Sequence, residues 1–223
     1  MKMGGYPVSR SVLPGARQAG LTLLLALSMA ALQVWAKPYD PPSETSIPSH
    51  PPKTHALSYP RNDVPGLPNF ARVSEVLYRG AQPDREGFRH LRNLGIRTVV
   101  NLRDHHSDEA DLKGLGFRYV NIPCKASEPE ASKVVAFLKV VTSPQDQPVY
   151  VHCLHGSDRT GMMVACYRIV ILGWSKDRAV AELSNFGFHN IWKNIRSFLR
   201  DMDPIAVVDD LAHATATPVE TVP

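Results

Sequence analysis

The stretch from Val149 to Gly161 constrains the fold more than any other part of this 223-residue chain. It opens with Val149-Tyr150-Val151, an apolar run that predicts a buried strand. Cys153 follows, a loop of five residues separates it from Arg159, and the apolar run after Thr160 predicts a buried helix. Strand, tight loop and helix are therefore expected here, with a thiol and a guanidinium at the two ends of the loop.

Such a loop suits a tetrahedral anion. The first N–H groups of a helix point into the loop, and the helix dipole favours negative charge there, including the thiolate of Cys153. Arg159 offers a planar fork that matches two phosphate oxygens, and Thr160 can donate its hydroxyl toward the thiolate. This chemistry predicts thiolate attack on phosphorus, a phosphocysteine and its hydrolysis by water, without a metal ion or another cofactor. The residues expected to bind phosphate are Leu154, His155, Gly156, Ser157, Asp158 and Arg159.

The pattern His-Cys-x5-Arg-Thr-Gly, from His152 to Gly161, resembles the signature loop of the cysteine-dependent protein tyrosine and dual-specificity phosphatases. The segment Tyr78-Arg79-Gly80-Ala81-Gln82-Pro83, then a helix, then Thr98-Val99-Val100-Asn101-Leu102-Arg103, is similar to compact bacterial members and to atypical plant and fungal ones. The resemblance covers residues 69–199. It implies a phosphatase of that class.

The remaining elements predict an α/β fold with a central, mostly parallel sheet that is covered by helices on both faces. The anion site should lie at the carboxyl end of a strand, where ligands bind in such sheets. Further strands are expected over 70–73, 76–79, 96–102 and 117–122, and helices over 84–94, 108–115, 130–141, 175–186 and 191–202. Core-facing positions are predicted at Val134, Phe137, Leu138 and Val141 of one helix and at Ile191, Ile195, Phe198 and Leu199 of the last.

The chain divides into four segments. Residues 1–36 combine basic residues, a short apolar run and Val34-Trp35-Ala36, which predicts a cleavable secretory signal; an uncleaved membrane anchor is the alternative. Residues 37–68 are rich in proline and predict an extended tether. Residues 69–203 form the expected catalytic domain, and residues 204–223 are expected to be a disordered tail. The catalytic domain is thus expected outside the cytoplasm, in the periplasm if the source is Gram-negative, without stable membrane insertion after cleavage.

The general acid is the open question of the sequence. The resemblance implies an aspartate on the loop after Ile122-Pro123, but the residues from Cys124 to Glu130 contain none. Asp158 is the first candidate, because an aspartate at that position is the proposed acid of myotubularin-like lipid phosphatases. Glu128 is the second candidate and Asp104 the third. The competing interpretations are that Asp158 holds a backbone amide of the loop and that Asp104 caps the next helix.

Three functions fit the sequence. The first is an exported phosphatase for phosphotyrosine, and also for phosphoserine or phosphothreonine; the second acts on inositol phosphates or phosphoinositides by the same mechanism; the third is a phosphate-binding pseudophosphatase. The expected partner is a phosphorylated protein or small molecule, and a monomer is expected. The net charge of +4 suits anionic substrates, but no lysine or arginine block indicates nucleic-acid binding. His152 is expected to bond around Cys153 rather than bind metal, and Cys124 is a candidate resolving thiol for oxidised Cys153, with plain space filling as the alternative.

Overall fold

The computed structural model describes residues 56–216. Five strands form one sheet in the order β1-β2-β5-β3-β4. Their bounds are β1 Ala71–Arg72, β2 Leu77–Gly80, β3 Thr98–Asn101, β4 Arg118–Asn121 and β5 Val149–His152. Only β1 is antiparallel to its neighbour, and the other pairings are parallel. The predicted mostly parallel α/β sheet is confirmed.

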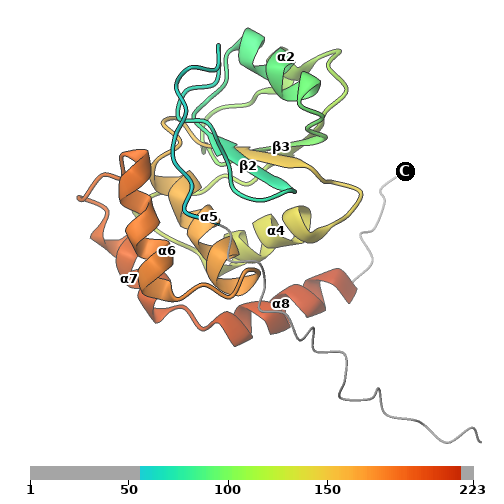
Figure 1. Ribbon diagram of the computed structural model, residues 1–223. Helices are drawn as coiled ribbons and strands as arrows, with labels where there is room; N and C mark the ends of the chain where they lie inside the picture. Colours follow the sequence, from blue (N-terminus) through green and yellow to red (C-terminus); the bar gives the residue numbers. More distant parts are fainter. Residues whose placement is uncertain (1–55, 217–223) are drawn as a thin grey trace, which may run out of the picture. The chain divides into compact units, whose positions relative to one another are not determined.

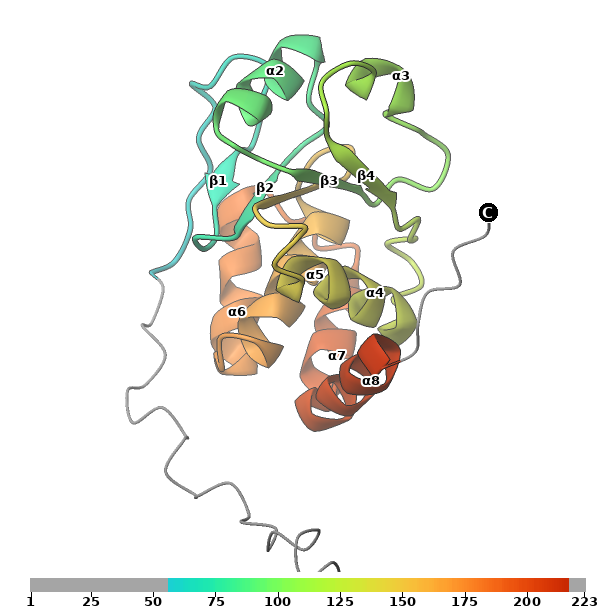
Figure 2. The same cartoon turned by 90° about the vertical axis from the view of Figure 1, so that its right-hand side faces the viewer.

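Helices cover both faces of the sheet, as Figure 2 shows. On one face lie α2 (Arg85–Asn93) and α3 (Glu109–Leu112). They contribute Phe88, Leu91 and Leu112 to a smaller core, which also contains Tyr150 of β5. On the other face lie the remaining helices, which share the larger core. These are α4 (Ala131–Thr142), α5 (Asp158–Val170), α6 (Lys176–Glu182) with the 3-10 turn η2 (Leu183–Phe186), α7 (Lys193–Asp201) and α8 (Pro204–Ala216).

Several local predictions are confirmed in atomic detail. The Asp84 carboxylate accepts from the Gly87 N–H at 2.8 Å and caps α2, and the Ser175 hydroxyl accepts from the Arg178 N–H and caps α6. Val134, Phe137, Leu138 and Val141 of α4 are all buried. In α7, Ile195 and Leu199 are buried and Phe198 packs against the core, but Ile191 is 76% exposed. That prediction was wrong because α7 begins two residues later, at Lys193.

The segment after residue 203 was predicted to be disordered, and for residues 204–216 this is wrong. They form α8, which packs against α4 and α5 and lies along the bottom of the molecule in Figure 1. Pro204 begins this helix rather than ending the previous one, since proline is well suited to the first helical position. Val207 is buried and Leu211 packs beside it one turn later. Residues 217–223 lie outside the described residues.

The predicted tether also ends earlier than expected. Residues 1–55, with the predicted signal, lie outside the described residues, but residues 56–68 are part of the domain. Leu67 is fully buried, and the Ser58 N–H donates to the Glu182 carboxylate at 2.7 Å. Arg168 forms a buried ion pair with the same carboxylate and donates to the Ser58 hydroxyl. Proline excludes regular structure from such a segment, but it does not prevent an extended chain from packing.

Candidate active site

The predicted phosphate loop follows β5, the middle strand of the sheet. The last residue of β5, His152, is in register with Gly80 at the end of β2 and with Asn101 at the end of β3. The three carboxyl ends therefore meet at one edge, with the segments that leave β2 and β3 on either side of Cys153. Ligands of parallel sheets bind at this edge.

Three consecutive carbonyl groups of the loop are bonded to the surrounding protein. The Leu154 carbonyl accepts from the backbone N–H of Gln82 at 3.1 Å. The His155 carbonyl accepts from the Asn69 side-chain amide at 3.0 Å, and the Gly156 carbonyl accepts from the Arg79 guanidinium at 2.7 Å. All three point away from the centre of the loop toward β2 and its flanking segments.

The direction of these carbonyls decides where the loop amides point. In a trans peptide the C=O and the following N–H are antiparallel. The N–H groups of His155, Gly156 and Ser157 are therefore turned inward, opposite the bonded carbonyls. They join the first N–H groups of α5, whose positive end lies at Asp158. The result is a ring of donors that suits a bound phosphate.

Gly156 is the position where this loop tolerates no side chain. Its φ is +72°, and a Cβ placed there would lie 2.5 Å from the Gly80 carbonyl carbon and 2.6 Å from the Ala81 nitrogen. Both the left-handed backbone and the contact with the β2 exit therefore require glycine. The loop is packed directly on the neighbouring strand.

Arg79, on β2, is a buried cation beneath the loop. Its guanidinium bonds the Gly156 carbonyl and lies 3.6 Å from the centroid of the Phe186 ring. Burial lowers the pKa of Arg79 to about 10, against the attraction of Glu182 and Cys153. The group therefore remains charged at neutral pH, and its charge favours a thiolate at Cys153.

Cys153 and Thr160 lie at the base of this ring of donors. Cys153 is 3% exposed at the start of the loop, and Thr160 is fully buried in the first turn of α5. The Thr160 hydroxyl has no hydrogen-bond partner among the described residues. A buried hydroxyl without a partner is uncommon, because it loses its bonds to water. Its donor is available for the thiolate, as the sequence predicts.

Asp108 and His152 form a fully buried pair below the nucleophile. The Asp108 Oδ2 atom lies 2.8 Å from Nε2 of His152, whose Nδ1 atom lies 3.3 Å from the Cys153 carbonyl oxygen. Both ring nitrogens thus face oxygen acceptors, and both are satisfied only when each carries a proton. The His152 ring is thus held between a carboxylate and a backbone carbonyl, which matches its predicted position around Cys153.

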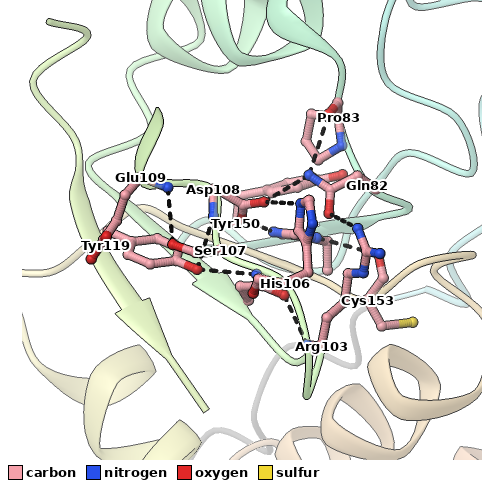
Figure 3. A network of polar contacts seen from close by, with 12 residues as sticks. Gln82, Pro83, Arg103, His106, Ser107, Asp108, Glu109, Tyr119, Tyr150 and Cys153 are labelled. Carbon is pink, nitrogen blue, oxygen red and sulfur yellow. Dashed lines mark hydrogen bonds and ion pairs between the residues drawn. The ribbon is translucent and has the colours of Figure 1, made fainter. Parts of the chain in front are cut away.

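A polar network holds Asp108 in place (Figure 3). Gln82 donates to Asp108 Oδ1 at 2.8 Å and accepts from Arg103 at 3.0 Å, while the Asp108 N–H donates to the Tyr119 hydroxyl. Burial by itself raises the pKa of Asp108, but the hydrogen bonds of His152 and Gln82 and the His152 charge outweigh it, so the pKa lies below its ordinary value. The carboxylate therefore stays ionised although it is buried.

Arg159, the cation of the signature, contacts the segments that follow β3 and β4. Its Nη1 atom is 3.3 Å from Asp104 Oδ1 and 3.5 Å from the Cys124 carbonyl oxygen. A backbone hydrogen bond, followed by the charges of His105 and Arg159, lowers the pKa of Asp104. Asp104 thus holds Arg159 as an ionised carboxylate, which is the opposite of what a proton donor needs.

The other two predicted acids occupy different surroundings. Glu128 is 70% exposed and pairs with Lys125 at 3.4 Å on the surface. Asp158 is nearly buried at the start of α5, where Oδ1 accepts from the backbone N–H of His189 and Oδ2 lies 2.9 Å from His189 Nδ1. Asp158 thus binds a backbone amide, but in the segment before α7 rather than in the phosphate loop. Direct proton donation by any of the three stays a prediction.

A cavity of about 280 Å³ lies beside the loop. Arg159, Asp158, His155 and His189 contribute its polar lining, and Leu154, Ile191, Trp192 and Ala126 form the apolar part. Leu154 and Ile191 are both exposed. Trp192 packs against the core and also lines this cavity.

Cys124 is buried, and its thiol donates to the Leu102 carbonyl. Burial, opposed by the charge of Arg159, raises the pKa of Cys124 to about 12. Thiol exchange requires a thiolate, so these surroundings disfavour the resolving role and favour space filling. All three cysteines are free thiols. Among residues 56–216, no group of three or more histidine, cysteine, aspartate or glutamate side chains is arranged to hold a metal ion.

The structure adds three residues that the sequence did not single out as part of the site. Arg79 was noted only within the segment that is similar to other phosphatases of this class. Asp108 was noted only as the first residue of a predicted helix, and His189 was not noted at all. Their partners lie 77, 44 and 31 positions away along the chain. The sequence held one signal for these residues, the charged Arg79 within the strand predicted over 76–79. A charged side chain in a buried strand needs a buried partner, so Arg79 could have been expected to bind another part of the site.

The fold and this site define a cysteine-dependent phosphatase. A family model described as "DSP-PTPase phosphatase fused to NAD+ Kinase" matches residues 63–198, and the chain belongs to this family of dual-specificity and tyrosine phosphatases. It is 33% identical over 172 residues to the dual specificity protein phosphatase TpbA of Pseudomonas aeruginosa, covering 76% of this chain and 74% of that protein. The enzyme class is thus a protein tyrosine or dual-specificity phosphatase, which sets the pseudophosphatase alternative aside.

A solved structure and a plant protein are also similar to this chain. A crystal structure of P. aeruginosa TpbA, a cysteine-to-serine variant in complex with pTyr, has a TM-score of 0.61 and 29% identity, and covers 69% of this chain and 96% of that one. Inositol diphosphatase DSP5 of Arabidopsis thaliana is 31% identical over 111 residues, 46% of this chain and 54% of that protein. The chain thus spans about half the length of the plant relative.

Proposed function

We propose that this chain is an exported phosphatase that hydrolyses phosphotyrosine, and also phosphoserine or phosphothreonine, through a phosphocysteine at Cys153. The observation that carries the mechanism is the loop itself. Three bonded carbonyls turn three N–H groups toward one point, between the buried thiol of Cys153 and the guanidinium of Arg159. A structural cysteine needs none of these features.

In the first step Cys153 Sγ attacks phosphorus, the bond from phosphorus to the leaving oxygen breaks, and that oxygen takes up a proton. The loop N–H groups and Arg159 bind the phosphoryl oxygens, where negative charge gathers in the transition state. In the second step water attacks phosphorus and the P–S bond breaks. The Thr160 hydroxyl then stabilises the departing thiolate, and inorganic phosphate leaves.

The preference for an aromatic phosphoester rests on the wall of the cavity. Leu154, Ile191 and Trp192 present apolar surface next to Arg159, with Leu154 43% and Ile191 76% exposed. An aryl ring buries this surface, whereas the side chain of phosphoserine is too short to cover it. The bound pTyr of the TpbA variant supports the same preference.

A second candidate substrate is an inositol phosphate or phosphoinositide. The basic side chains around the cavity favour it: His155 and His189 line the cavity, their ring centroids 6.0 Å apart, beside Arg159. The similarity to a plant inositol diphosphatase also supports it. A substrate with several phosphates would contact this cluster, while phosphotyrosine would use mainly the apolar wall.

Export is supported by the sequence of residues 1–36 alone. Within residues 56–216 no helix is long and apolar enough to cross a membrane. Expression of the full chain in a Gram-negative host, followed by cell fractionation and mass spectrometry of the N-terminus, tests the proposal. A mature chain that begins near Lys37 in the periplasmic fraction is expected. A full-length chain in the cytoplasm would contradict export.

One substrate panel tests the catalytic proposal. The purified mature chain is assayed with phosphotyrosyl, phosphoseryl and inositol phosphate substrates in the presence of a chelator. The phosphotyrosyl peptide should have the highest kcat/KM, and Cys153→Ser should abolish all turnover. Full activity in that variant would exclude the covalent mechanism, and a higher kcat/KM for inositol phosphates would select the second candidate.

A further inference from the structure

His189 is attached to the phosphate loop by Asp158. Asp158 is the first residue of α5, and His189 lies in the segment between η2 and α7. One carboxylate oxygen accepts from the backbone N–H of His189 at 2.9 Å, and the other lies 2.9 Å from the ring atom Nδ1. These two contacts hold both the backbone and the ring of His189 close to Arg159, because Arg159 directly follows Asp158 in the chain.

The carboxylate also decides which ring nitrogen is available. An ionised aspartate only accepts hydrogen bonds, so Nδ1 of His189 carries a proton. Nε2 has no hydrogen-bond partner among the described residues. The ring is 52% exposed, so Nε2 can exchange protons with water, and His189 lines the same cavity as Arg159.

The loop that carries the acid in related phosphatases has no aspartate in this chain. The glutamate that was the candidate acid of this loop, Glu128, is exposed and paired with Lys125, and Asp104 is bonded to Arg159. Two histidines, His155 and His189, also line the cavity. Of these, His189 has its ring oriented by a carboxylate, that of Asp158. Histidine is also the side chain that most readily exchanges protons near neutral pH.

We propose that His189 is the general acid of this phosphatase and that Asp158 is its positioning residue. The proposal rests on the phosphocysteine mechanism and names the group that completes it. In the first step His189 Nε2–H gives its proton to the leaving oxygen as the P–O bond breaks, which leaves a neutral imidazole. In the second step Nε2 takes a proton from the attacking water as the P–S bond breaks, which restores the imidazolium.

The test compares leaving groups. His189→Gln is expected to reduce kcat for an alkyl phosphate about 100-fold or more, and kcat for nitrophenyl phosphate by only a few-fold, because nitrophenolate leaves without a proton. The alkaline limb of the pH–rate profile for the alkyl substrate should also disappear. The groups that face His189 are Asp158 and Arg159 of α5 and His155 of the loop, while Arg196 of α7 bonds the neighbouring Asn190.

His155→Gln is the matched control, since it removes a neighbouring histidine from the same cavity but not the pair with Asp158. It should slow both substrates by the same factor. Asp158→Asn should show the leaving-group effect in weaker form. If Asp158→Asn shows the effect and His189→Gln does not, Asp158 is the direct acid and the proposal is overturned.

Two further readouts separate a chemical role from a structural one. Added imidazole should restore alkyl phosphate turnover in His189→Ala, which opens space for it, but not in His155→Ala. Circular dichroism and thermal unfolding show whether the variants fold. An equal loss for both leaving groups in a folded His189→Gln would overturn the proposal. The covalent mechanism has its own test, which is the loss of nitrophenyl phosphate turnover in Cys153→Ser. That test does not depend on the outcome for His189.

Discussion

The site has two halves that differ in how they are held. Its floor, formed by Arg79, Gln82, Asp108 and His152, is mostly buried, and hydrogen bonds join it to three strands and their exits. Its rim, formed by Lys125, Glu128, His155, His189 and Ile191, is largely exposed. His155 belongs to the phosphate loop itself, and His189 is bonded to it through Asp158.

The difference follows the chemistry of each half. In the proposed mechanism the floor supports the loop that binds the thiolate and the phosphoryl oxygens. These are the same for every substrate, so a rigid arrangement favours the transition state without reorganisation. The rim meets the leaving group, which varies from substrate to substrate. Substitutions in the floor should therefore change all substrates alike, and substitutions in the rim should discriminate between them.

Of four further substitutions in the two halves, Arg159→Lys should have the largest effect. The ammonium group retains the charge but not the paired donors of the fork, so transition-state stabilisation should fall by about 3 kcal/mol, or roughly 100-fold in kcat. Steady-state kinetics with nitrophenyl phosphate measures this loss. An Arg159→Lys variant within a few-fold of the wild type would show that the paired contact is not used.

Arg79→Met should have the next largest effect. It removes the buried cation and leaves the Gly156 carbonyl without its partner, which costs about 1–3 kcal/mol. Inhibition by inorganic phosphate should weaken, and the free energy of unfolding should fall. Phosphate inhibition equal to that of the wild type in a folded variant would mean that Arg79 does not position the loop.

Asp108→Asn should disturb the side chain of His152 next to the nucleophile. It removes the carboxylate that holds Nε2 of His152, so Cys153 should react more slowly with iodoacetamide at neutral pH. Tyr119→Phe is the control, because it removes a hydroxyl that binds Asp108 but no charge. A reaction rate that falls equally in both variants would point to general loosening of the network.

Glu128→Gln should have the smallest effect, a change of kcat of less than about three-fold for any leaving group. The side chain is 70% exposed and paired with Lys125, and exposed pairs contribute little. The same comparison of alkyl and nitrophenyl phosphates is the measurement. A selective loss with the alkyl substrate would make Glu128 the acid and would move the acid from the His189 side of the rim to the loop after β4.

Features that are local in the chain could be predicted from the sequence. The run around Val149 indicated a buried strand, the spacing from Cys153 to Arg159 indicated a phosphate loop, and Asp84 and Ser175 indicated helix starts. Each of these depends on neighbours within a few residues, through period, capping or turn chemistry. For the same reason local pattern failed at Pro204, where the helix is stabilised by packing against α4.

Only the tertiary structure decided how the loop is supported. The partners of Gly156, His152 and Asp158 are Arg79, Asp108 and His189, which lie far away in the chain and meet because three parallel strands end at one edge. A buried charge needs a partner, but the chain can supply that partner from any element that folds beside it. The sequence alone therefore determined the position of the candidate nucleophile and of the phosphate loop, while the folded structure decided which distant side chains hold them and which histidine is bonded to Asp158.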